Sequence, residues 1–200
     1  MTISAKQVKE LRDRTGAGFM ECKSALAEAN GNFDDAVTVL RTRGQARAAK
    51  RASRSTSQGL VGHYIHQGGQ VGVLVEVNCE SDFVARTDEF KTLVREIAMH
   101  IAAADPGCIT RNEVPVEDLE REKAIYLAQF EGTNKPPQVI DKIVDGKLNS
   151  YYEQVALLDQ PSIRDPKTTI GAMVTAAIAK LGENITVTRF ARFKVGEDPE

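Results

Sequence analysis

The stretch GLVGHYIHQGGQVGVLVEVNC, residues 59–79, constrains the fold more than any other part of the sequence. Two alternating runs lie on either side of Gly68 and Gly69, a pair that a two-residue primed turn favours. Such a turn joins adjacent antiparallel strands, so we expect a β-hairpin with a row of valines on one face of its second strand. These valines are Val71, Val73, Val75 and Val77.

The remainder of this region is mostly helical and ends in one more strand. Apolar residues recur at helical spacing in residues 87–104 and 168–181. Residues 185–195 alternate, and we expect them to join the hairpin as a third strand. Strands at both ends with helices between them predict an α+β fold, in which helices pack on one face of an antiparallel three-stranded sheet.

Two further helical patterns, residues 116–131 and 137–155, are joined by the short segment GTNKPP. So short a connection predicts an antiparallel helical hairpin. We expect this hairpin, about residues 116–156, to be inserted in the core and to project from it.

The first forty residues contain the cap and turn signals of three short helices. Ser4 can cap the first helix, RTGAG at residues 14–18 interrupts the pattern, and Gly31 ends the second helix. Asn32 can cap a third helix, which we expect to end at Gly44. A bundle of this size buries little apolar surface and is typical of an interaction module.

Residues 41–54, RTRGQARAAKRASR, contain six basic residues and no acidic one, and the polar segment SRSTSQG overlaps their end. We expect a domain boundary here, between residues 1–54 and 55–200. A basic run can bind a phosphate backbone by releasing counterions. Because no aromatic residues are interleaved for base stacking, we favour a solvated helix and linker.

Composition excludes several classes of protein. The 200 residues are 42% hydrophobic and 27% charged, which is typical of a globular chain. The net charge of -2 argues against a surface built throughout for nucleic acid or anionic lipid. No apolar run approaches the ~20 residues of a membrane span, and residues 1–17 lack a signal-peptide pattern, so we expect the cytoplasm.

Common catalytic and metal-binding motifs are missing from the sequence. Cys22, Cys79 and Cys108 form no CxxC, so we expect reduced thiols. His63 and His66 are three apart on a strand, so their side chains point to opposite faces and cannot simply share an ion. Without phosphate-binding, dinucleotide, zinc-protease or serine-hydrolase motifs, we expect no catalytic residue, metal or cofactor.

The residues that follow the hairpin allow two interpretations. Phe83 precedes Phe90 by seven positions, so periodicity favours a buried Phe83 that begins the apolar stripe of the next helix. Alternatively, Ser81 caps a helix with Asp82 in its first turn, and Phe83 lies exposed at the N-terminal end of that helix. His100 presents a similar choice between a buried and a functional role, because it borders the stripe of its helix. Spacing leaves both questions open.

Four motifs resemble the elongation factor Ts family, the nucleotide exchange factors of elongation factor Tu. They are RTGAGFMECKSAL at residues 14–26, VNCESDFVAR at 77–86, IAMHIAA at 97–103 and LGENITVTRFARF at 181–193. The resemblance implies an N-terminal module similar to a ubiquitin-associated domain, here residues 1–54. It also implies binding to GDP-bound and nucleotide-free elongation factor Tu and promotion of GDP release without covalent chemistry.

The resemblance also implies which residues act. The T-D-F-V motif of the family corresponds to Ser81, Asp82, Phe83 and Val84, which would dislocate Mg²⁺ from elongation factor Tu. Serine replaces the usual threonine, but both residues cap helices. Further implied contacts with the partner are Lys23, His100, Leu181 and Gly182.

The resemblance also bears on the oligomeric state of the chain. Longer family members repeat the core unit, whereas this chain has residues for one copy, so a homodimer that completes the binding surface is one hypothesis and a monomer is the alternative. Some compact relatives bridge the dimer with a cysteine where this chain has Ala191, so pairing here would be non-covalent.

There are two alternatives to nucleotide exchange. One is an adaptor built on residues 1–54, and the other is an RNA-binding protein that uses residues 41–54.

Overall fold

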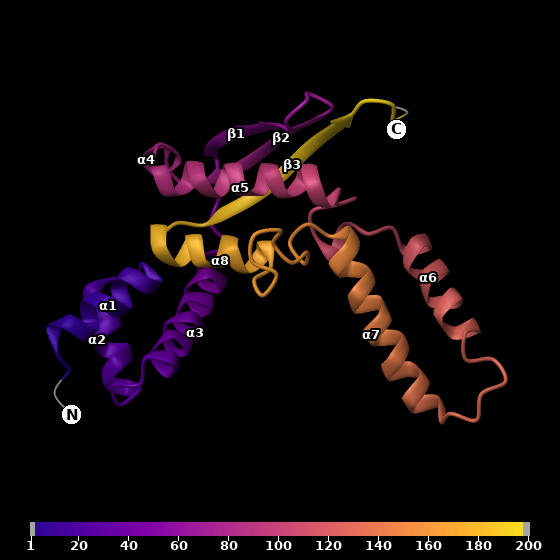
Figure 1. Ribbon diagram of the computed structural model, residues 1–200, viewed down its shortest axis with the longest axis horizontal. Helices are drawn as coiled ribbons and strands as arrows, with labels where there is room; N and C mark the ends of the chain where they lie inside the picture. Colours follow the sequence, from indigo (N-terminus) through magenta and orange to yellow (C-terminus); the bar gives the residue numbers. More distant parts are fainter. Residues whose placement is uncertain (1–2, 198–200) are drawn as a thin grey trace. The chain divides into compact units, whose positions relative to one another are not determined.

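The computed structural model describes residues 3–197, and within them it contains eight α-helices and a three-stranded antiparallel sheet (Figure 1). The predicted α+β class is therefore confirmed. The elements are α1 (Ala5–Thr15), α2 (Phe19–Glu28), α3 (Phe33–Arg51), β1 (Gln58–Ile65), β2 (Val71–Cys79), α4 (Asp82–Ala85), α5 (Asp88–Ala104), the 3-10 helix η1 (Arg111–Glu113), α6 (Val116–Ala128), α7 (Pro137–Val155), α8 (Ile170–Leu181) and β3 (Ile185–Lys194).

The sheet has the strand order β1-β2-β3, so the last strand pairs with the second strand of the hairpin, as predicted. Burial alternates along β2 because successive side chains point to opposite faces. Val73, Val75 and Val77 are buried, whereas Leu74 between them is exposed. The row of valines therefore forms the core-facing side of this strand.

The hairpin loop is longer than predicted. The N–H of His66 donates to the carbonyl of Val71, which leaves residues 67–70 as a four-residue connection. The predicted two-residue turn is therefore wrong. Gly68 and Gly69 still supply the left-handed backbone, with φ of 91° and 70°, because glycine has no Cβ to oppose it.

Helices α1, α2 and α3 contact one another around a small apolar core. Ser4 caps α1 reciprocally with Gln7: the hydroxyl of Ser4 accepts from the backbone N–H of Gln7, and the side chain of Gln7 accepts from the N–H of Ser4. The buried members of this core are Val8, Leu11, Cys22, Ala25, Leu26 and Ala36. The likeness of these helices to a ubiquitin-associated domain stays a prediction.

Helix α3 does not end at Gly44, as the sequence pattern predicted, but continues to Arg51. Gly44 is buried, and a β-carbon at this position would lie 3.1 Å from the β-carbon of Ala179 in α8. The guanidinium of Arg51 donates to the carbonyl of Ile178 at 3.3 Å. Gly44 therefore allows a close approach of α8 instead of ending the helix.

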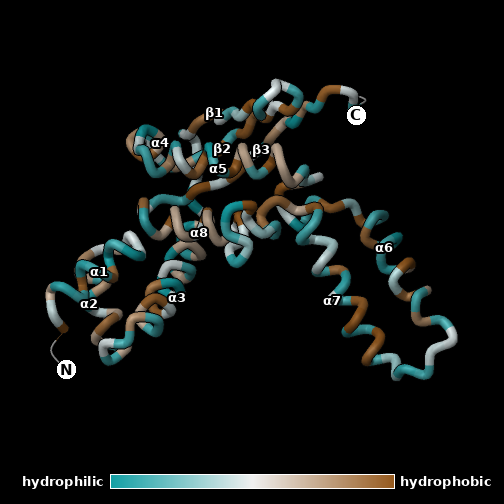
Figure 2. The backbone as a smooth tube through the Cα atoms, in the orientation of Figure 1, coloured by the Kyte–Doolittle hydropathy of each residue, from teal (hydrophilic) through white to brown (hydrophobic). Residues whose placement is uncertain are grey.

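Helices α6 and α7 contact each other and form the predicted helical hairpin of the chain (Figure 1). Hydrophobic residues are interspersed with hydrophilic ones along both helices (Figure 2). Helix α6 ends at Ala128, three residues before the predicted end, because the chain turns at residues 129–132. Projection of the hairpin from the core stays a prediction.

The described residues form two compact units, each assembled from separate stretches of chain. The first comprises the chain up to Val61, Glu76–Val94 and Met173–Thr186, and the second comprises Gly62–Val75, Arg95–Ala172 and the chain from Val187 onward. The division into residues 1–54 and 55–200 stays a prediction. The contacts around residues 80–84 described below lie within the first unit.

We predict that Gly59→Ala destabilises the protein. Gly59 has φ of 153°, and a β-carbon there would lie 2.2 Å from the carbonyl oxygen of Val77. Backbone strain and overpacking each cost ~1–3 kcal/mol, so the free energy of unfolding in urea should fall by ~2 kcal/mol or more. Gly146→Ala is the control, because its β-carbon meets nothing within 4 Å and alanine favours helix α7 by ~1 kcal/mol. Equal effects of the two substitutions would contradict the packing at Gly59.

Candidate functional site

A short helix, α4, connects the end of β2 to the long helix α5. Ser81 is its N-cap residue, and the hydroxyl of Ser81 accepts a hydrogen bond from the N–H of Val84 at 3.4 Å. Thr87 then separates the two helices: its hydroxyl donates to the carbonyl of Val84 and accepts from the N–H of Phe90. Of the two interpretations that the sequence left open, the one with a cap at Ser81 is therefore confirmed.

Phe83 lies on α4 and is 80% exposed, whereas Phe90 is completely buried. The interpretation of Phe83 as the first residue of the α5 stripe is therefore wrong. The seven-residue spacing fails because residues 86–87 break the helix, so Phe83 and Phe90 belong to two helices without a common phase. Single exposed apolar residues are common, but an exposed aromatic on a fixed backbone is the typical form of a binding anchor.

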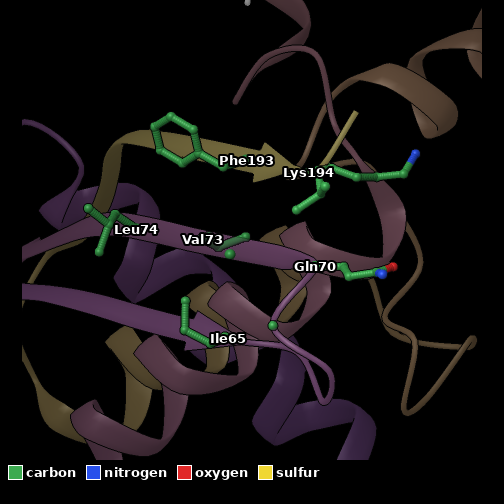
Figure 3. A pocket seen from close by; sticks show the side chains of 9 residues that line it. Ile65, Gln70, Val73, Leu74, Phe193 and Lys194 are labelled. Carbon is green, nitrogen blue, oxygen red and sulfur yellow. The ribbon is translucent and has the colours of Figure 1, made fainter. Parts of the chain in front are cut away.

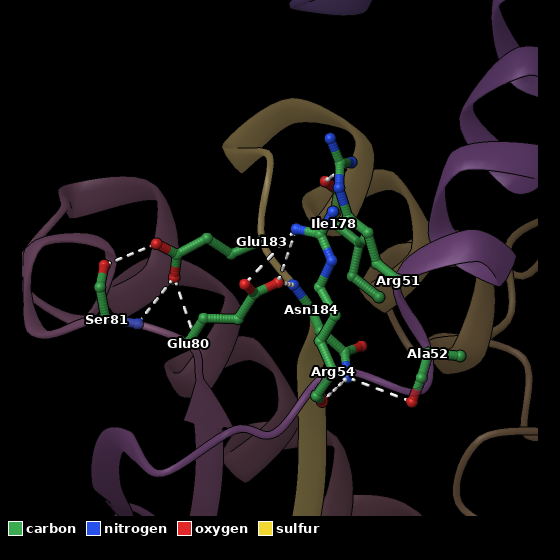
Figure 4. A network of polar contacts seen from close by, with 8 residues as sticks. All are labelled: Arg51, Ala52, Arg54, Glu80, Ser81, Ile178, Glu183 and Asn184. Atoms are coloured by element: carbon green, nitrogen blue, oxygen red, sulfur yellow. Dashed lines mark hydrogen bonds and ion pairs between the residues drawn. The ribbon is translucent and has the colours of Figure 1, made fainter.

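The backbone before α4 is held by the carboxylate of Glu183, which follows α8 (Figure 4). One carboxylate oxygen accepts from the N–H groups of Glu80 and Ser81, at 3.1 and 3.0 Å. The other oxygen accepts from the hydroxyl of Ser81 at 2.6 Å. The hydroxyl of Ser81 thus donates to Glu183 and accepts from α4, so it links the helix directly to the carboxylate.

Hydrogen bonds also run in the opposite direction between these segments. The carboxylate of Glu80 accepts from the N–H of Asn184 at 2.6 Å and lies 3.5 Å from the guanidinium of Arg54. The buried amide of Asn184 donates to the carbonyls of Ala52 and Arg54, at 3.4 and 2.9 Å (Figure 4). Three stretches that are distant in sequence are therefore joined immediately before Phe83.

Asp82 makes an ion pair with Arg86, one turn along the chain, at 2.7 Å. Both side chains are substantially exposed, with relative accessibilities of 46% and 76%. Exposed pairs of this kind contribute little to stability, in general ~0.2–1 kcal/mol. The carboxylate of Asp82 is therefore accessible to a partner at small energetic cost.

The structure places the other predicted site residues in three locations. Lys23 is exposed on α2, close in sequence to the exposed Phe19 and Met20. Leu181 ends α8, and Gly182 follows with φ of 83°, directly before Glu183. These two residues thus adjoin the hydrogen bonds that hold Ser81.

His100 lies in the second unit and is only 1% exposed. Its Nε2 lies 2.9 Å from the side-chain oxygen of Gln160, whose amide nitrogen donates to the carbonyl of Gln154 at 2.6 Å. Within residues 3–197, no hydrogen-bond partner reaches Nδ1 of His100. Burial lowers the pKa of His100, partly opposed by the bond to Gln160. A direct contact of this imidazole with a partner stays a prediction.

The basic run of residues 41–54 is largely engaged inside the chain. Arg43 pairs with Glu28, and Arg47 pairs with Glu21. Arg51 and Arg54 bind Ile178 and Glu80 as described above. Arg43, Arg47 and Arg51 therefore join α3 to α2 and α8, and Arg54, beyond the helix, joins it to Glu80. The run thus has structural contacts that the sequence did not reveal.

Other classes of site receive no support from the part of the chain that the structure describes. Residues 3–197 contain no cluster of three His, Cys, Asp or Glu side chains arranged to hold a metal ion. Among the same residues, no helix is both long and apolar enough to span a membrane. The three cysteines are free thiols; Cys22 and Cys79 are buried, Cys108 is partly buried, and desolvation raises the pKa of each.

The chain is similar to known proteins over nearly its whole length. Residues 4–197 match the profile of the family described as Elongation factor TS. The chain belongs to the elongation factor Ts family. It is 56% identical to elongation factor Ts of Fervidobacterium nodosum over 98% of this chain and 100% of that protein. It is equally similar, at 56%, to the Solibacter usitatus factor over 98% of this chain and 92% of that protein.

A third relative, elongation factor Ts of Caldanaerobacter subterraneus, is 56% identical over 99% of both chains. Membership of the elongation factor Ts family implies a factor of protein biosynthesis that exchanges nucleotide on elongation factor Tu during translation elongation. The roles of Glu80, Glu183 and Asn184 were not predicted from the sequence. The motif LGEN contains two of them, but their polar partners lie about a hundred residues away and leave no local signal.

We predict that His100 makes stability depend on pH. Its pKa is lowered in the fold, so the unfolded chain binds a proton more readily than the folded chain. The stabilising contribution is complete above the unfolded pKa of about 6.5 and is lost as the pH falls below it, by up to ~1.4 kcal/mol per pH unit. Urea unfolding of wild type and His100→Asn between about pH 7.5 and about pH 5.5 measures this effect, because these limits lie roughly one unit above and below the reference pKa. A parallel pH dependence in both proteins would contradict it.

Proposed function

We propose that this chain binds elongation factor Tu·GDP, disturbs its Mg²⁺ and phosphate site, and promotes GDP release so that GTP can bind. The observation that supports this best is Phe83, an aromatic side chain that is 80% exposed on a backbone held by hydrogen bonds on both sides. An anchor of this kind can enter a partner without reorganising its own loop, which reduces the entropic cost of binding.

The proposed reaction is a coupling of two binding equilibria. A factor that binds the nucleotide-free GTPase better than its GDP form must weaken GDP binding by the same ratio. A thousandfold acceleration of release requires only about 4 kcal/mol of differential stabilisation. A buried aromatic anchor and a few polar contacts can supply this amount, and no covalent step is needed.

Within this proposal, the residues of α4 have distinct tasks. Phe83 inserts between helices of the GTPase domain near the metal site, where its apolar ring becomes buried. Asp82 releases Arg86 and disturbs the water and side-chain network that holds Mg²⁺. Ser81 and Val84 keep α4 formed, through the cap between the Ser81 hydroxyl and the Val84 N–H.

The N-terminal helices provide a second contact with elongation factor Tu in this proposal. Phe19 and Met20 are 45% and 69% exposed at the start of α2, and Lys23 lies one turn further along. Adjacent apolar residues with a neighbouring cation are typical of a docking patch, because burial supplies affinity and charge supplies orientation. Elongation factor Tu acts in translation, so we expect this chain to work in the cytoplasm.

We predict that Phe83→Ala removes most of the exchange activity. Loss of an anchor that contributes ~2 kcal/mol lowers the rate about 30-fold. The measurement is release of a fluorescent GDP analogue from purified elongation factor Tu, with wild type, with the variant and without either. Far-UV circular dichroism should be unchanged, because an exposed side chain contributes little to folding.

Ile163→Ala is the matched control for this experiment, because Ile163 is also exposed, at 49%, but lies in the second unit. This variant should release GDP as the wild type does. No acceleration by the wild type would reject the exchange function in favour of an adaptor role. Equal acceleration by wild type and Phe83→Ala would retain the function but exclude Phe83 from it.

We also propose that two copies of the chain pair through the exposed face of the sheet. In the second unit, a hollow of about 480 Å³ is lined by Ile65, Leu74 and Phe193, among others (Figure 3). These three side chains are 62%, 50% and 67% exposed, and Val195 beside them is 73% exposed. Ala191 is exposed two positions before Phe193, so the place of the bridging cysteine of some relatives lies on the same face.

A two-fold axis places this apolar face against an identical face, which is the simplest way for a single-core chain to cover it. We predict that light scattering gives twice the monomer mass of 21.9 kDa at micromolar concentrations of the protein. Concentrations on this order are those at which typical non-obligate dimers form. Phe193→Asp should return the mass to that of a monomer, because burying an unpaired carboxylate opposes association. A wild-type mass that stays at 21.9 kDa across these concentrations would exclude the dimer.

A further inference from the structure

We propose that Glu183 is a positioning residue for nucleotide exchange, which acts by fixing the backbone that presents Phe83. This inference rests on the proposed function and adds a residue to it that does not itself contact the partner. Glu183 binds the two residues immediately before α4 and uses both carboxylate oxygens to do so. Its effect on exchange is therefore transmitted through Ser81 to Phe83.

The contact suits the acceptor capacity of a carboxylate. Three donors converge on Glu183: the N–H groups of Glu80 and Ser81 and the hydroxyl of Ser81. An ionised carboxylate only accepts hydrogen bonds and has about four lone-pair positions, so it satisfies all three donors. A glutamine in this place has one accepting oxygen, which can serve the two N–H groups, and its NH₂ group would face the Ser81 hydroxyl. That hydroxyl could then no longer donate to residue 183, and the charge that strengthens all three bonds would be lost. Replacement of Glu183 by glutamine therefore weakens the contact with little change of size.

The position of Glu183 is itself set by the end of α8. Gly182 has φ of 83°, and its N–H donates to the carbonyl of Ile178 at 3.0 Å. This left-handed glycine ends the helix and turns the chain, so that Glu183 faces residues 80–81 and Asn184 faces Glu80. The implied importance of Gly182 in this family thus has an explanation within the chain, independent of any contact with the partner.

Phe83 depends on this support because its own ring contributes little to its placement. A side chain that is 80% exposed has few intramolecular contacts to hold it. Helix α4 has only four residues, which is too short to be stable alone. The orientation of the ring therefore depends on the cap at Ser81, and the cap depends on Glu183, whose oxygen binds the same hydroxyl at 2.6 Å. Loss of Glu183 should loosen residues 80–84 and leave the remainder of the fold intact.

The first measurement is amide hydrogen exchange in Glu183→Gln, which needs no partner. We expect residues 80–84 to exchange about tenfold faster or more, because charge-assisted hydrogen bonds to two of the backbone groups are weakened. Glu89→Gln is the matched control: it removes the same charge in the same unit, from a carboxylate that pairs with Lys180 of α8 at 3.3 Å. This control should leave exchange at residues 80–84 as in the wild type.

The second measurement is release of a fluorescent GDP analogue from elongation factor Tu as a function of the concentration of each variant. We expect Glu183→Gln to lower the maximal release rate about tenfold, with the half-saturating concentration changed by less than about threefold, since the docking patch on α2 is untouched. In a double-mutant cycle, Glu183→Gln combined with Phe83→Ala should release GDP as slowly as Phe83→Ala alone.

The two proposals fail in different ways. A wild type that does not accelerate GDP release rejects the proposed function. A wild type that accelerates release while Glu183→Gln matches it rejects the positioning role of Glu183. Unchanged hydrogen exchange at residues 80–84 in Glu183→Gln, or additive losses in the double mutant, also overturn the inference, because Glu183 would then act independently of Phe83.

Discussion

The pairing of residues 80–81 with residues 183–184 is the interaction on which the candidate site depends. Glu183 accepts from the backbone of Ser81, while Glu80 accepts from the backbone of Asn184, so each segment supplies both a carboxylate and N–H groups to the other. Reciprocal bonds of this kind satisfy polar groups that partial burial would otherwise leave without water. They also fix the end of β2, the start of α4 and the end of α8 in a single arrangement. The amide of Asn184 extends this arrangement to the end of α3.

Under the proposed function, this arrangement resolves a conflict between stability and binding. An exposed aromatic side chain contributes no burial energy in the free protein, so folding alone does not favour its placement. A flexible aromatic, in turn, would lose conformational entropy on binding and weaken the contact. Polar anchoring of the backbone next to Phe83 avoids both difficulties, because the ring stays exposed while its attachment is held. The valine row of β2 and the buried Phe90 of α5 supply apolar burial on either side of this segment.

Much of the fold could be predicted from the sequence, because periodic burial leaves a local pattern. The alternating strands, the helical stripes and the caps at Ser4 and Ser81 were all identified correctly for this reason. The errors fell where a distant contact overrides a local signal. Gly44 has the character of a helix end, yet α3 continues because α8 packs closely at that glycine. The hairpin loop is the exception: a local bond between His66 and Val71 closes it one pair earlier than the glycines indicate and leaves four residues in the loop.

The candidate site could be predicted only in part, and the physical reason lies in how an exposed side chain is held in place. A buried residue is positioned by neighbours that share its periodic pattern, so the pattern reveals it. Phe83 has no such neighbours, and the seven-residue spacing to Phe90 was misleading because a two-residue break separates their helices. The information that positions an exposed side chain must therefore reside in groups that bond to its backbone. In this chain the main one is Glu183, about a hundred residues away, where neither spacing nor hydropathy distinguishes it from a solvated surface carboxylate.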